Sequence, residues 1–389
     1  MQRKPVNERA RWRDYAESVG FNYHTIDGEP YWDESAYYQF SWQQIENELE
    51  PATEELHEMA LALGPEILAS EDLLSQLGIP AAYWDYIADS WPAQPQLYGR
   101  MDLCYDGKTP PKLLELNYDT PTSLFESSFF QWMWLEDLIG DGVLPEAADQ
   151  FNSLQEKLIE AFKLLNLPQP FYFSCVGDSA EDVGNTLYLM DCAVQAGLGT
   201  QFLPLEQLGQ GGGQFVDAAG NAINGMFKLY PWEFMLAEEF ASVLLTSNTR
   251  FVEPPWKLVL SNKGILPLLW QKYPDHPNLL PGYFEDSANA PLQKGWVRKP
   301  LYSREGSNVE LVNANGEKIA AEGPYGSGRY IRQQFCPLPQ FQDQKRGQTA
   351  YTLTGSWVVG DRAAGIGLRE DASLITTNTS RFVPHIILD

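Results

Sequence analysis

The chain contains few of the residues on which zinc, disulfide and nucleophilic chemistry depend. Its four cysteines lie far apart and form no Cys-x-x-Cys pair, so neither a zinc site nor a disulfide framework is indicated. We expect all four to be reduced residues of the core. The four histidines are also scattered, which gives little support to a Ser-His-Asp triad or a histidine-rich metal site. These residues are Cys104, Cys175, Cys192, Cys336, His24, His57, His276 and His385.

Long apolar runs are also missing. No run approaches the ~18 residues that a membrane-spanning helix needs, and the first 17 residues are polar and mixed in charge. We therefore expect a soluble cytoplasmic protein without a membrane partner.

Positive charge is scarce, with 27 Lys and Arg against 52 Asp and Glu and a formal net charge of −25. Such a chain repels a phosphate backbone, which makes nucleic acid an unsuitable partner and favours cationic small molecules. An acidic surface that only maintains solubility would give the same composition. A Walker A loop is absent too, because the pattern G-x-x-x-x-G-K-[ST] does not occur.

What is present is enough for a large globular core. The chain has 389 residues, of which 44% are hydrophobic and 13% aromatic. Apolar spacing of three and four predicts helices over 56–63, 71–77 and 83–89, with Gly64-Pro65 as a break, so residues 1–95 are expected to be helical. Segments 96–105 and 112–118 are predicted to form a hairpin.

Residues 96–255 continue as a mixed α/β part. Helices are expected over 123–138, with Ser123 and Glu126 at capping-box spacing, and over 150–165. A strand over 171–176 followed by a helix over 185–196 is typical of alternating α/β construction. From residue 256 onward the chain is expected to be strand-rich, with strands over 296–302, 309–312, 318–321, 330–335, 351–359 and 364–368. The predicted fold class is α+β, with an antiparallel C-terminal part that could hold a nucleotide between sheets.

The predicted hairpin carries an unusual set of polar residues. Alternation places Arg100 and Asp102 on one face of the first strand, and Glu115, Asn117 and Asp119 on one face of the second. Carboxylate and amide oxygens suit Mg²⁺, and an arginine could balance them or grip a substrate carboxylate. The solvated outer face of an ordinary hairpin remains an alternative.

Hydroxyl residues follow the hairpin where a helix is expected to begin. Thr120, Thr122 and Ser123 could face a carboxylate or a phosphate there, because a helix N-terminus presents free N–H groups. Simple capping of the helix would explain them equally well.

Basic residues next to small residues form a third feature. Lys263 lies in Ser-Asn-Lys-Gly, and Lys299 leads into Ser303-Arg304-Glu305-Gly306-Ser307-Asn308. Both positions suit charge neutralisation of a phosphate, although a lone lysine is more often a surface residue. Arg369 stands at a strand end, where it could anchor a phosphoryl group or pair with Glu370 or Asp371. The high aromatic content favours a second class of function, a carbohydrate-active site with paired carboxylates, as an alternative.

Taken in order, Arg-x-Asp, Glu-x-Asn-x-Asp-Thr, Asn-Lys-Gly-Ile-Leu-Pro, Lys-Pro with Arg-x-Gly-Ser-Asn, and Leu-Arg-x-Asp resemble the glutathionylspermidine synthase family. The resemblance covers nearly the whole chain and is strongest to members that consist of the synthetase portion alone. It implies one ATP-grasp unit over 1–389 that uses ATP and Mg²⁺ to activate a peptide carboxylate as an acyl phosphate, which a polyamine attacks. A nucleotide-binding protein with altered catalysis is the alternative within this family.

The resemblance also implies roles for individual residues. It assigns Asp102, Glu115 and Asn117 to Mg²⁺, and Arg100 and Arg369 to catalysis, with Arg100 holding the carboxylate. Residues 299–308 would form a lid loop. The implied nucleotide contacts are Lys263, Lys299, Ser307, Gln333 and Gln334. The implied substrate contacts are Arg100, Thr120, Thr122, Glu181 and Asp182.

Two departures from the family pattern limit these expectations. Nothing before residue 90 supplies the catalytic cysteine of the amidase part of the bifunctional synthase, so hydrolysis of the amide product is not expected. Pro121 stands between Thr120 and Thr122 where the synthase has a small residue, so glutathione is not assumed to be the acid. Neither the acid, the amine nor the oligomeric state follows from the sequence.

Overall fold

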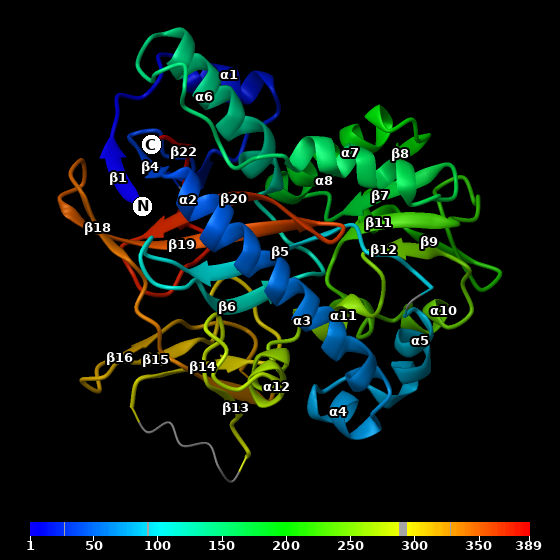
Figure 1. Ribbon diagram of the computed structural model, residues 1–389. Helices are drawn as coiled ribbons and strands as arrows, with labels where there is room; N and C mark the ends of the chain where they lie inside the picture. The colour runs from blue at the N-terminus through cyan, green and yellow to red at the C-terminus, as the bar shows by residue number, and fades with distance from the viewer. Residues whose placement is uncertain (27, 92, 288–293, 327) are drawn as a thin grey trace.

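The computed structural model describes residues 1–26, 28–91, 93–287, 294–326 and 328–389 of the chain. It is a mixed α/β structure with several sheets. Figure 1 shows an antiparallel sheet at the centre, a parallel sheet to its right and a second antiparallel sheet below it.

The central antiparallel sheet contains the predicted hairpin. Its strand order is β21-β20-β19-β5-β6, with β18 paired to β19. The hairpin strands β5 and β6 pair with Asp102 opposite Glu115 and Arg100 opposite Asn117, and β5 also pairs with the long strand β19. The strands are β5 (Tyr98–Cys104), β6 (Lys112–Asn117), β18 (Gln340–Asp343), β19 (Gln348–Val359), β20 (Arg362–Asp371) and β21 (Arg381–Val383).

The lower antiparallel sheet has the order β13-β17-β14-β15-β16. Four of its strands were predicted from the sequence, and the short β13 was not. Its strands are β13 (Gly282–Phe284), β14 (Trp296–Pro300), β15 (Glu310–Val312), β16 (Lys318–Ala320) and β17 (Tyr330–Gln334). The stretch from residue 257, expected to be strand-rich, instead begins with helices α11 (Lys257–Ser261) and α12 (Ile265–Lys272). Both helices are buried on nearly all sides, and a continuous apolar run shows no period that separates helix from strand.

The third sheet is parallel and lies in the part of the chain that was predicted to show alternating α/β construction. Its order is β12-β11-β7-β8. It contains the predicted strand and helix, β7 followed by α8, and α7 packs against α8. The elements are α7 (Leu154–Leu164), β7 (Phe171–Cys175), α8 (Ala180–Gln195), β8 (Thr200–Phe202), β11 (Gly225–Leu229) and β12 (Arg250–Val252). The carboxyl ends of β7 and β11 meet at one sheet edge, where parallel sheets commonly bind ligands.

The N-terminal part is not wholly helical, contrary to the prediction. A sheet of order β1-β4-β22 joins it to the end of the chain. Strand β4 has the sequence Ala-Tyr-Tyr-Gln-Phe and is buried on both faces, so it shows no alternation, and its partner β22 lies at the other end of the sequence. The strands of this sheet are β1 (Gln2–Pro5), β4 (Ala36–Phe40) and β22 (His385–Ile387). Strands β2 (Thr25–Ile26) and β3 (Glu29–Pro30) form a separate two-stranded sheet.

The helices expected in the N-terminal part are present, but the break at Gly64-Pro65 is wrong. Helix α3 continues through Pro65 to Leu68, one turn further. A proline in the last turn removes a single hydrogen bond, and the ring of Trp91 packs beside the helix at Gly64. The helices are α1 (Trp12–Ser18), α2 (Trp42–Gln44), α3 (Glu50–Leu68), α4 (Glu71–Gln76) and α5 (Trp84–Asp89).

The remaining elements are short and connect these sheets. The Gly-Gly-Gly loop turns between β9 and β10, and α6 follows a π-helical turn η3. They are η1 (Ile45–Leu49), η2 (Ala81–Tyr83), η3 (Glu126–Phe130), α6 (Gln131–Gly140), η4 (Leu205–Gln207), β9 (Gly209–Gly211), β10 (Gln214–Val216), α9 (Trp232–Met235) and α10 (Ala241–Leu244).

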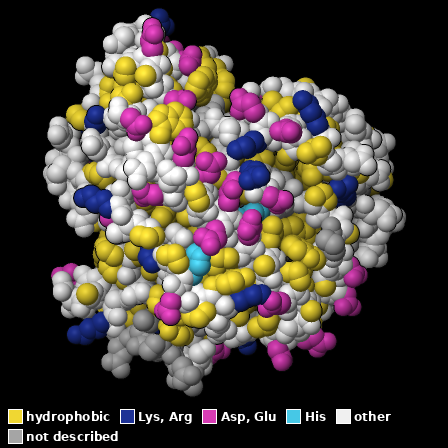
Figure 2. All heavy atoms as spheres, in the orientation of Figure 1, with side chains coloured by type: hydrophobic (Ala, Val, Ile, Leu, Met, Phe, Trp, Pro, Cys, Tyr) yellow, Lys and Arg dark blue, Asp and Glu magenta, His cyan; other side chains and the backbone are white. Residues whose placement is uncertain are grey.

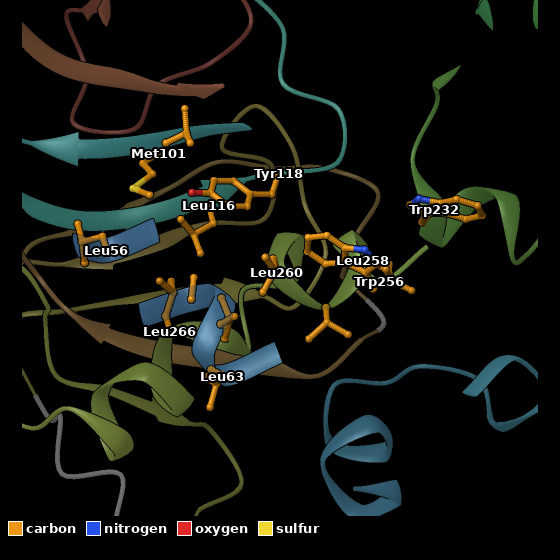
Figure 3. Packing of buried hydrophobic residues seen from close by; sticks show 14 of the residues in the cluster. Leu56, Leu63, Met101, Leu116, Tyr118, Trp232, Trp256, Leu258, Leu260 and Leu266 are labelled. Carbon is orange, nitrogen blue, oxygen red and sulfur yellow. The ribbon is translucent and has the colours of Figure 1, made fainter. Parts of the chain in front are cut away.

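A continuous apolar core fixes the hairpin in place. Figure 3 shows Leu56 and Leu63 of α3, Met101 and Leu116 of the hairpin and Leu266 of α12 packed together, and all five are buried. Full burial of a leucine contributes about 2 kcal/mol relative to exposure. The apolar face of the hairpin is therefore packed in the core, which holds its polar face in a fixed position.

The surface agrees with the acidic composition. Figure 2 shows acidic side chains spread over the viewed face with basic side chains between them. No helix in the described part of the chain is long and apolar enough to cross a lipid bilayer.

Candidate active site

A cavity of about 310 Å³ opens where the hairpin, the carboxyl ends of β7 and β11 and the loop after β14 meet. Three arginines and five acids line it, together with hydroxyl and apolar residues. The arginines are Arg100, Arg304 and Arg369, and the acids are Asp102, Glu115, Glu181, Asp182 and Glu305. Most of the residues singled out in the sequence therefore line one cavity. Arg100 and Arg369, for example, are 269 positions apart in the chain.

The hairpin presents its polar face to this cavity. Arg100 donates to Asp102 Oδ1 from Nε at 2.8 Å and to the carbonyl of Thr122 from Nη1 at 2.7 Å. The Asn117 amide donates to Asp102 Oδ2 at 3.0 Å. The expected shared surface of Arg100, Asp102, Glu115 and Asn117 is therefore present, and the alternative of a plain solvated face does not describe it.

Asp119 departs from that expectation. Its strand ends at Asn117, and the side chain of Asp119 turns into the protein, where it is 1% exposed. There it accepts hydrogen bonds from Lys228 Nζ and the Trp232 backbone N–H, both at 2.7 Å. Alternation applies only within a strand, so it fails two residues beyond the end of β6.

The two lysines reach the hairpin from the lower sheet and from the segment before α12. Lys263 forms an ion pair with Glu115 at 2.9 Å and donates to the Ser303 carbonyl at 2.7 Å. Lys299 donates to the carbonyl of Leu114 at 2.8 Å. Burial lowers the pKa of Lys299 to about 8, against the opposing attraction of Glu115. Burial alone would raise the pKa of Glu115, but the lysines and Arg100 outweigh it and hold that pKa below its usual value.

A second, more apolar cavity of about 100 Å³ adjoins the first, and the two share Asp102, Glu115 and Gly306 among their lining residues. It lies between the two antiparallel sheets, because β6, β14, β17 and β19 all contribute to it. Gln333 is buried and holds Lys299 through its carbonyl oxygen at 2.9 Å, whereas Gln334 is exposed. Both glutamines and Lys299 line this cavity.

Arg369 lies on the far side of the first cavity and does not pair with its neighbours Glu370 and Asp371 in sequence. Its guanidinium donates to the carbonyls of Ser380 at 2.9 Å and Thr377 at 3.1 Å. Glu370 points to the opposite face of β20 and binds Arg3 and Arg381. The guanidinium of Arg369 is therefore held in place by carbonyl groups while it faces the cavity.

Three carboxylates gather at the end of the cavity formed by α8 and the loop after β14. Within the described residues, no Lys or Arg forms an ion pair with Glu181, Asp182 or Glu305. Burial and the neighbouring Glu181 raise the pKa of Asp182 to about 6, and the same causes raise the pKa of Glu305. Arg304 and Arg369 act on these carboxylates only at longer range, so a cationic ligand could still pair with them directly.

The hydroxyl residues after the hairpin do not form the expected capping box. Ser123 has a φ of 70° and contacts the hydroxyl of Tyr31 at 3.2 Å, and Glu126 is buried and accepts from that same hydroxyl at 2.6 Å. The first free N–H groups of the helix are instead satisfied by Asn185 of α8, whose amide oxygen accepts from Leu124 at 2.7 Å. Thr120 and Thr122 line the cavity as expected.

Sequence reasoning did not select three residues of the site. Arg304 donates to the hydroxyl of Thr120 at 2.7 Å and to Glu233 at 2.9 Å, and Glu305 lines the cavity beside it. Glu126 lies behind the acidic end, where burial and Glu181 raise its pKa to about 7. Arg304 and Glu305 stand inside the quoted Ser-Arg-Glu-Gly-Ser-Asn motif, so the signal was present, but side-chain direction in an irregular loop cannot be inferred from sequence.

The loop at 299–308 lies across both cavities. Gly306 lines each of them, with a φ of 68°, and Glu305 and Asn308 also have positive φ. Ser307 is not among the described residues that line either cavity, and neither is Lys263, which lies behind Glu115.

The donor set on the hairpin fits a hard cation. Asp102, Glu115 and Asn117 supply two carboxylates and one amide oxygen beside a cavity, and Mg²⁺ commonly takes few protein ligands and completes its octahedron with water and phosphate. The described residues include no group of three or more His, Cys, Asp or Glu side chains placed to hold a metal ion, so a transition-metal site of that kind is not indicated.

The sequence of the chain is similar to proteins of a known family. A family model described as "Glutathionylspermidine synthase preATP-grasp" matches residues 3–388. The chain belongs to this family. A Haemophilus influenzae protein named "Putative acid--amine ligase" is 40% identical over 384 residues, which cover 95% of this chain and 94% of that protein.

The bifunctional glutathionylspermidine synthetase/amidase of Escherichia coli is 28% identical over 97% of this chain, which spans only 64% of that protein. A glutathione synthetase-like effector of Globodera pallida has a similar fold, with a TM-score of 0.54, 11% identity and 98% of each chain covered. The family and these relatives make the chain an enzyme of the acid–amine ligase class.

Proposed function

We propose that the chain is an ATP- and Mg²⁺-dependent carboxylate–amine ligase of the ATP-grasp type, which forms an amide by way of an acyl phosphate. The observation that carries this proposal is a cavity lined by three arginines and five acids, joined to a second cavity between two antiparallel sheets. The arginines suit a carboxylate, the carboxylates of α8 and of the loop after β14 suit an amine, and the space between the sheets suits a nucleotide.

The nucleotide is proposed to occupy the cavity between the sheets. Its apolar lining suits the base, and Gln333 or Gln334 of β17 would contact the edge of that base. Lys299 lines this cavity, where it would neutralise the phosphates and exchange its present carbonyl partner for a phosphate oxygen. Lys263 lies behind Glu115 and would reach a phosphate only if its contacts with Glu115 and the Ser303 carbonyl break. Ser307 would approach only if the loop at 299–308 closes further.

Asp102, Glu115 and Asn117 would hold Mg²⁺ at the junction of the two cavities. The ion supplies charge neutralisation at the transferring phosphoryl group when it is bound. The ion pair between Lys263 and Glu115 holds this carboxylate ionised, as metal ligation requires.

Arg100 is proposed to hold the substrate carboxylate. It is locked by Asp102 and by the Thr122 carbonyl, so it loses little freedom when a ligand binds. A carboxylate oxygen attacks the terminal phosphorus of ATP, ADP leaves, and an acyl phosphate forms. Arg369 and Arg100 flank the reacting group and stabilise the charge on the acyl phosphate.

The amine is proposed to enter at the acidic end. Glu181, Asp182 and Glu305 would attract it, and a bound ammonium would lower the pKa values that burial and Glu181 raise at Asp182 and Glu305. The amine nitrogen, in its neutral form, attacks the acyl carbon, the acyl C–O bond breaks as phosphate leaves, and the proton lost from nitrogen passes to the leaving phosphate. Three carboxylates favour an amine with more than one positive charge, such as a polyamine.

The acid is proposed to be a peptide or a related molecule that extends along Thr120 and Thr122. Pro121 lines the cavity between the two threonines, where the bifunctional synthase has a small residue. The acid bound here can therefore differ from glutathione, which serves as a probe and not as an assumed substrate. A carbohydrate-active site fits less well, because no tryptophan is among the described residues that line either cavity.

The experiment is product analysis by mass spectrometry. Purified protein, Mg-ATP, a panel of peptides and a panel of polyamines are mixed, and each pair is compared with mixtures that lack the acid or the amine. The proposal predicts ADP and a product whose mass is the sum of acid and amine less one water, for at least one pair. ADP release that is independent of both acid and amine would contradict it, and a nucleotide-binding protein with altered catalysis would bind Mg-ATP and form no product.

A further inference from the structure

Asp119 turns away from the hairpin face that carries Asp102, Glu115 and Asn117. Its contacts connect three segments of the site. It follows β6, and its carboxylate binds both Lys228 of β11 and the first N–H of α9 at Trp232. The side chains of Asp119 and Lys228 are each 1% exposed. Lys228 also donates to the Tyr230 carbonyl at 2.9 Å, and Tyr230 lines the cavity.

The contacts around Asp119 close into a ring. Its neighbour Thr120 accepts from Arg304 Nη1 at 2.7 Å, and Arg304 Nη2 donates to Glu233 at 2.9 Å. Glu233 is the residue after Trp232, which returns the ring to Asp119. The ring therefore runs through the hairpin end, the start of α9 and the loop after β14.

We propose that Asp119 is a positioning residue for the ligase site. It holds Thr120 and Glu233 at a fixed separation, so that the two together orient Arg304 and the loop at 299–308 over the cavity. The expected change in the KM for the acid rests on the proposed function. The expected change in the mobility of the loop can be measured without turnover.

Asp119→Asn tests this role because the carboxamide has only one acceptor oxygen. Lys228 and Trp232 donate to different oxygens of the carboxylate, and in asparagine one of these positions is an NH2 group that cannot accept, so one of the two contacts is lost. We expect faster amide hydrogen exchange in peptides that contain residues 232–236 and 299–308. We also expect the KM for the acid, with glutathione and spermidine as the first probe pair, to rise ~10-fold, while the KM for ATP changes little.

Two further variants separate positioning from folding. Asp119→Asn combined with Lys228→Met removes the buried ammonium and frees the asparagine oxygen for Trp232, so exchange and KM should return toward the wild type. Leu158→Ala opens a cavity in α7, away from the ring, and should lower the melting temperature without changing either readout.

The outcomes are distinct. Faster exchange at 299–308 in Asp119→Asn alone supports the proposal, even if no acid and amine are turned over by the wild type, in which case the proposed function fails by itself. Equal effects of Asp119→Asn and Leu158→Ala would overturn it, because Asp119 would then serve only stability. A folded double variant that stays as impaired as the single variant would also overturn it.

Discussion

Glu115 of the hairpin lines both cavities and forms an ion pair with Lys263. Its replacement is therefore the most direct test of the site by a single residue. Glu115→Ala takes away one proposed metal ligand and leaves a buried ammonium without its partner. We predict that ADP formation falls by ~10²-fold or more, measured as a steady-state rate at saturating Mg-ATP.

The control for this variant is Glu160→Gln. Glu160 is an exposed acid of α7 and its replacement also removes one negative charge. Its rate should equal that of the wild type. Glu115→Ala with a wild-type rate and an intact fold would show that the hairpin does not hold the metal.

The carboxylates at the acidic end predict a pH dependence for the amine. The pKa of Asp182 is raised to about 6 by burial and by Glu181, so this group loses its charge as the pH falls through 6. We predict that the KM for the amine rises as the pH is lowered from 8 to 5.5. Asp182→Asn should raise the KM at pH 8 and flatten this profile, and an unchanged profile in that variant would exclude Asp182 as an amine contact.

The residue scale also shows how far the sequence was informative. Alternation along two strands correctly placed Arg100, Asp102, Glu115 and Asn117 on one surface, because period two is a property of the backbone. Asp119 was misplaced because it lies past the strand end. Arg304 was not selected because its partners Thr120 and Glu233 lie far away in the sequence.

At the scale of an element, Gly306 of the loop at 299–308 can be compared with Gly316, which lies in the turn between β15 and β16. A Cβ on Gly306 would lie 2.5 Å from the carbonyl oxygen of Thr376, whereas a Cβ on Gly316 would meet nothing within 4 Å. Both have positive φ, 68° and 88°. Alanine therefore carries a similar backbone cost of about 1 kcal/mol at each site, and only Gly306→Ala forces the loop away from the segment that it touches.

We predict that Gly306→Ala raises the KM for ATP ~10-fold, while Gly316→Ala leaves it unchanged. The measurement is ADP release as a function of ATP concentration for both variants. Equal KM values in the two variants would show that the loop does not need to rest against Thr376 when the nucleotide binds.

The elements differ in how well the sequence predicts them. Strands with clear turns and β-branched or aromatic residues, such as β14 to β17, β19 and β20, were predicted, and so were α3, α7 and α8. Strand β4 and helices α11 and α12 were not predicted. They are buried on most sides, so their apolar residues show neither the two-residue period of a strand nor the 3.6-residue period of a helix. The break predicted at Gly64-Pro65 is wrong, because tertiary packing on α3 outweighs one missing hydrogen bond.

At the scale of the whole molecule, the site exists only where three sheets come together. The hairpin, the parallel sheet and the lower antiparallel sheet each contribute to the lining of the cavities. Contacts between segments hundreds of residues apart leave no local signal, so the residues alone predicted separate acidic and basic features. The order of the motifs, through the family, was what joined them.

Binding of Mg-ATP should be visible in the stability of the whole chain. A ligand at 100 times its Kd adds about 2.7 kcal/mol to the free energy of unfolding if it binds only the folded state. We predict a clear rise in the melting temperature with Mg-ATP, measured by differential scanning fluorimetry, and a smaller rise with ATP and a chelator. Lys299→Met should remove most of the rise, and an equal rise in that variant would place the nucleotide elsewhere.

The central claim is that the site activates a carboxylate by phosphorylation before the amine attacks. The most direct test uses the acid labelled with oxygen-18 in its carboxylate and follows the label by mass spectrometry of the released phosphate. The account predicts that each phosphate carries one labelled oxygen, since the carboxylate oxygen that attacks ATP leaves with the phosphoryl group. Amide formation accompanied by unlabelled phosphate would contradict it.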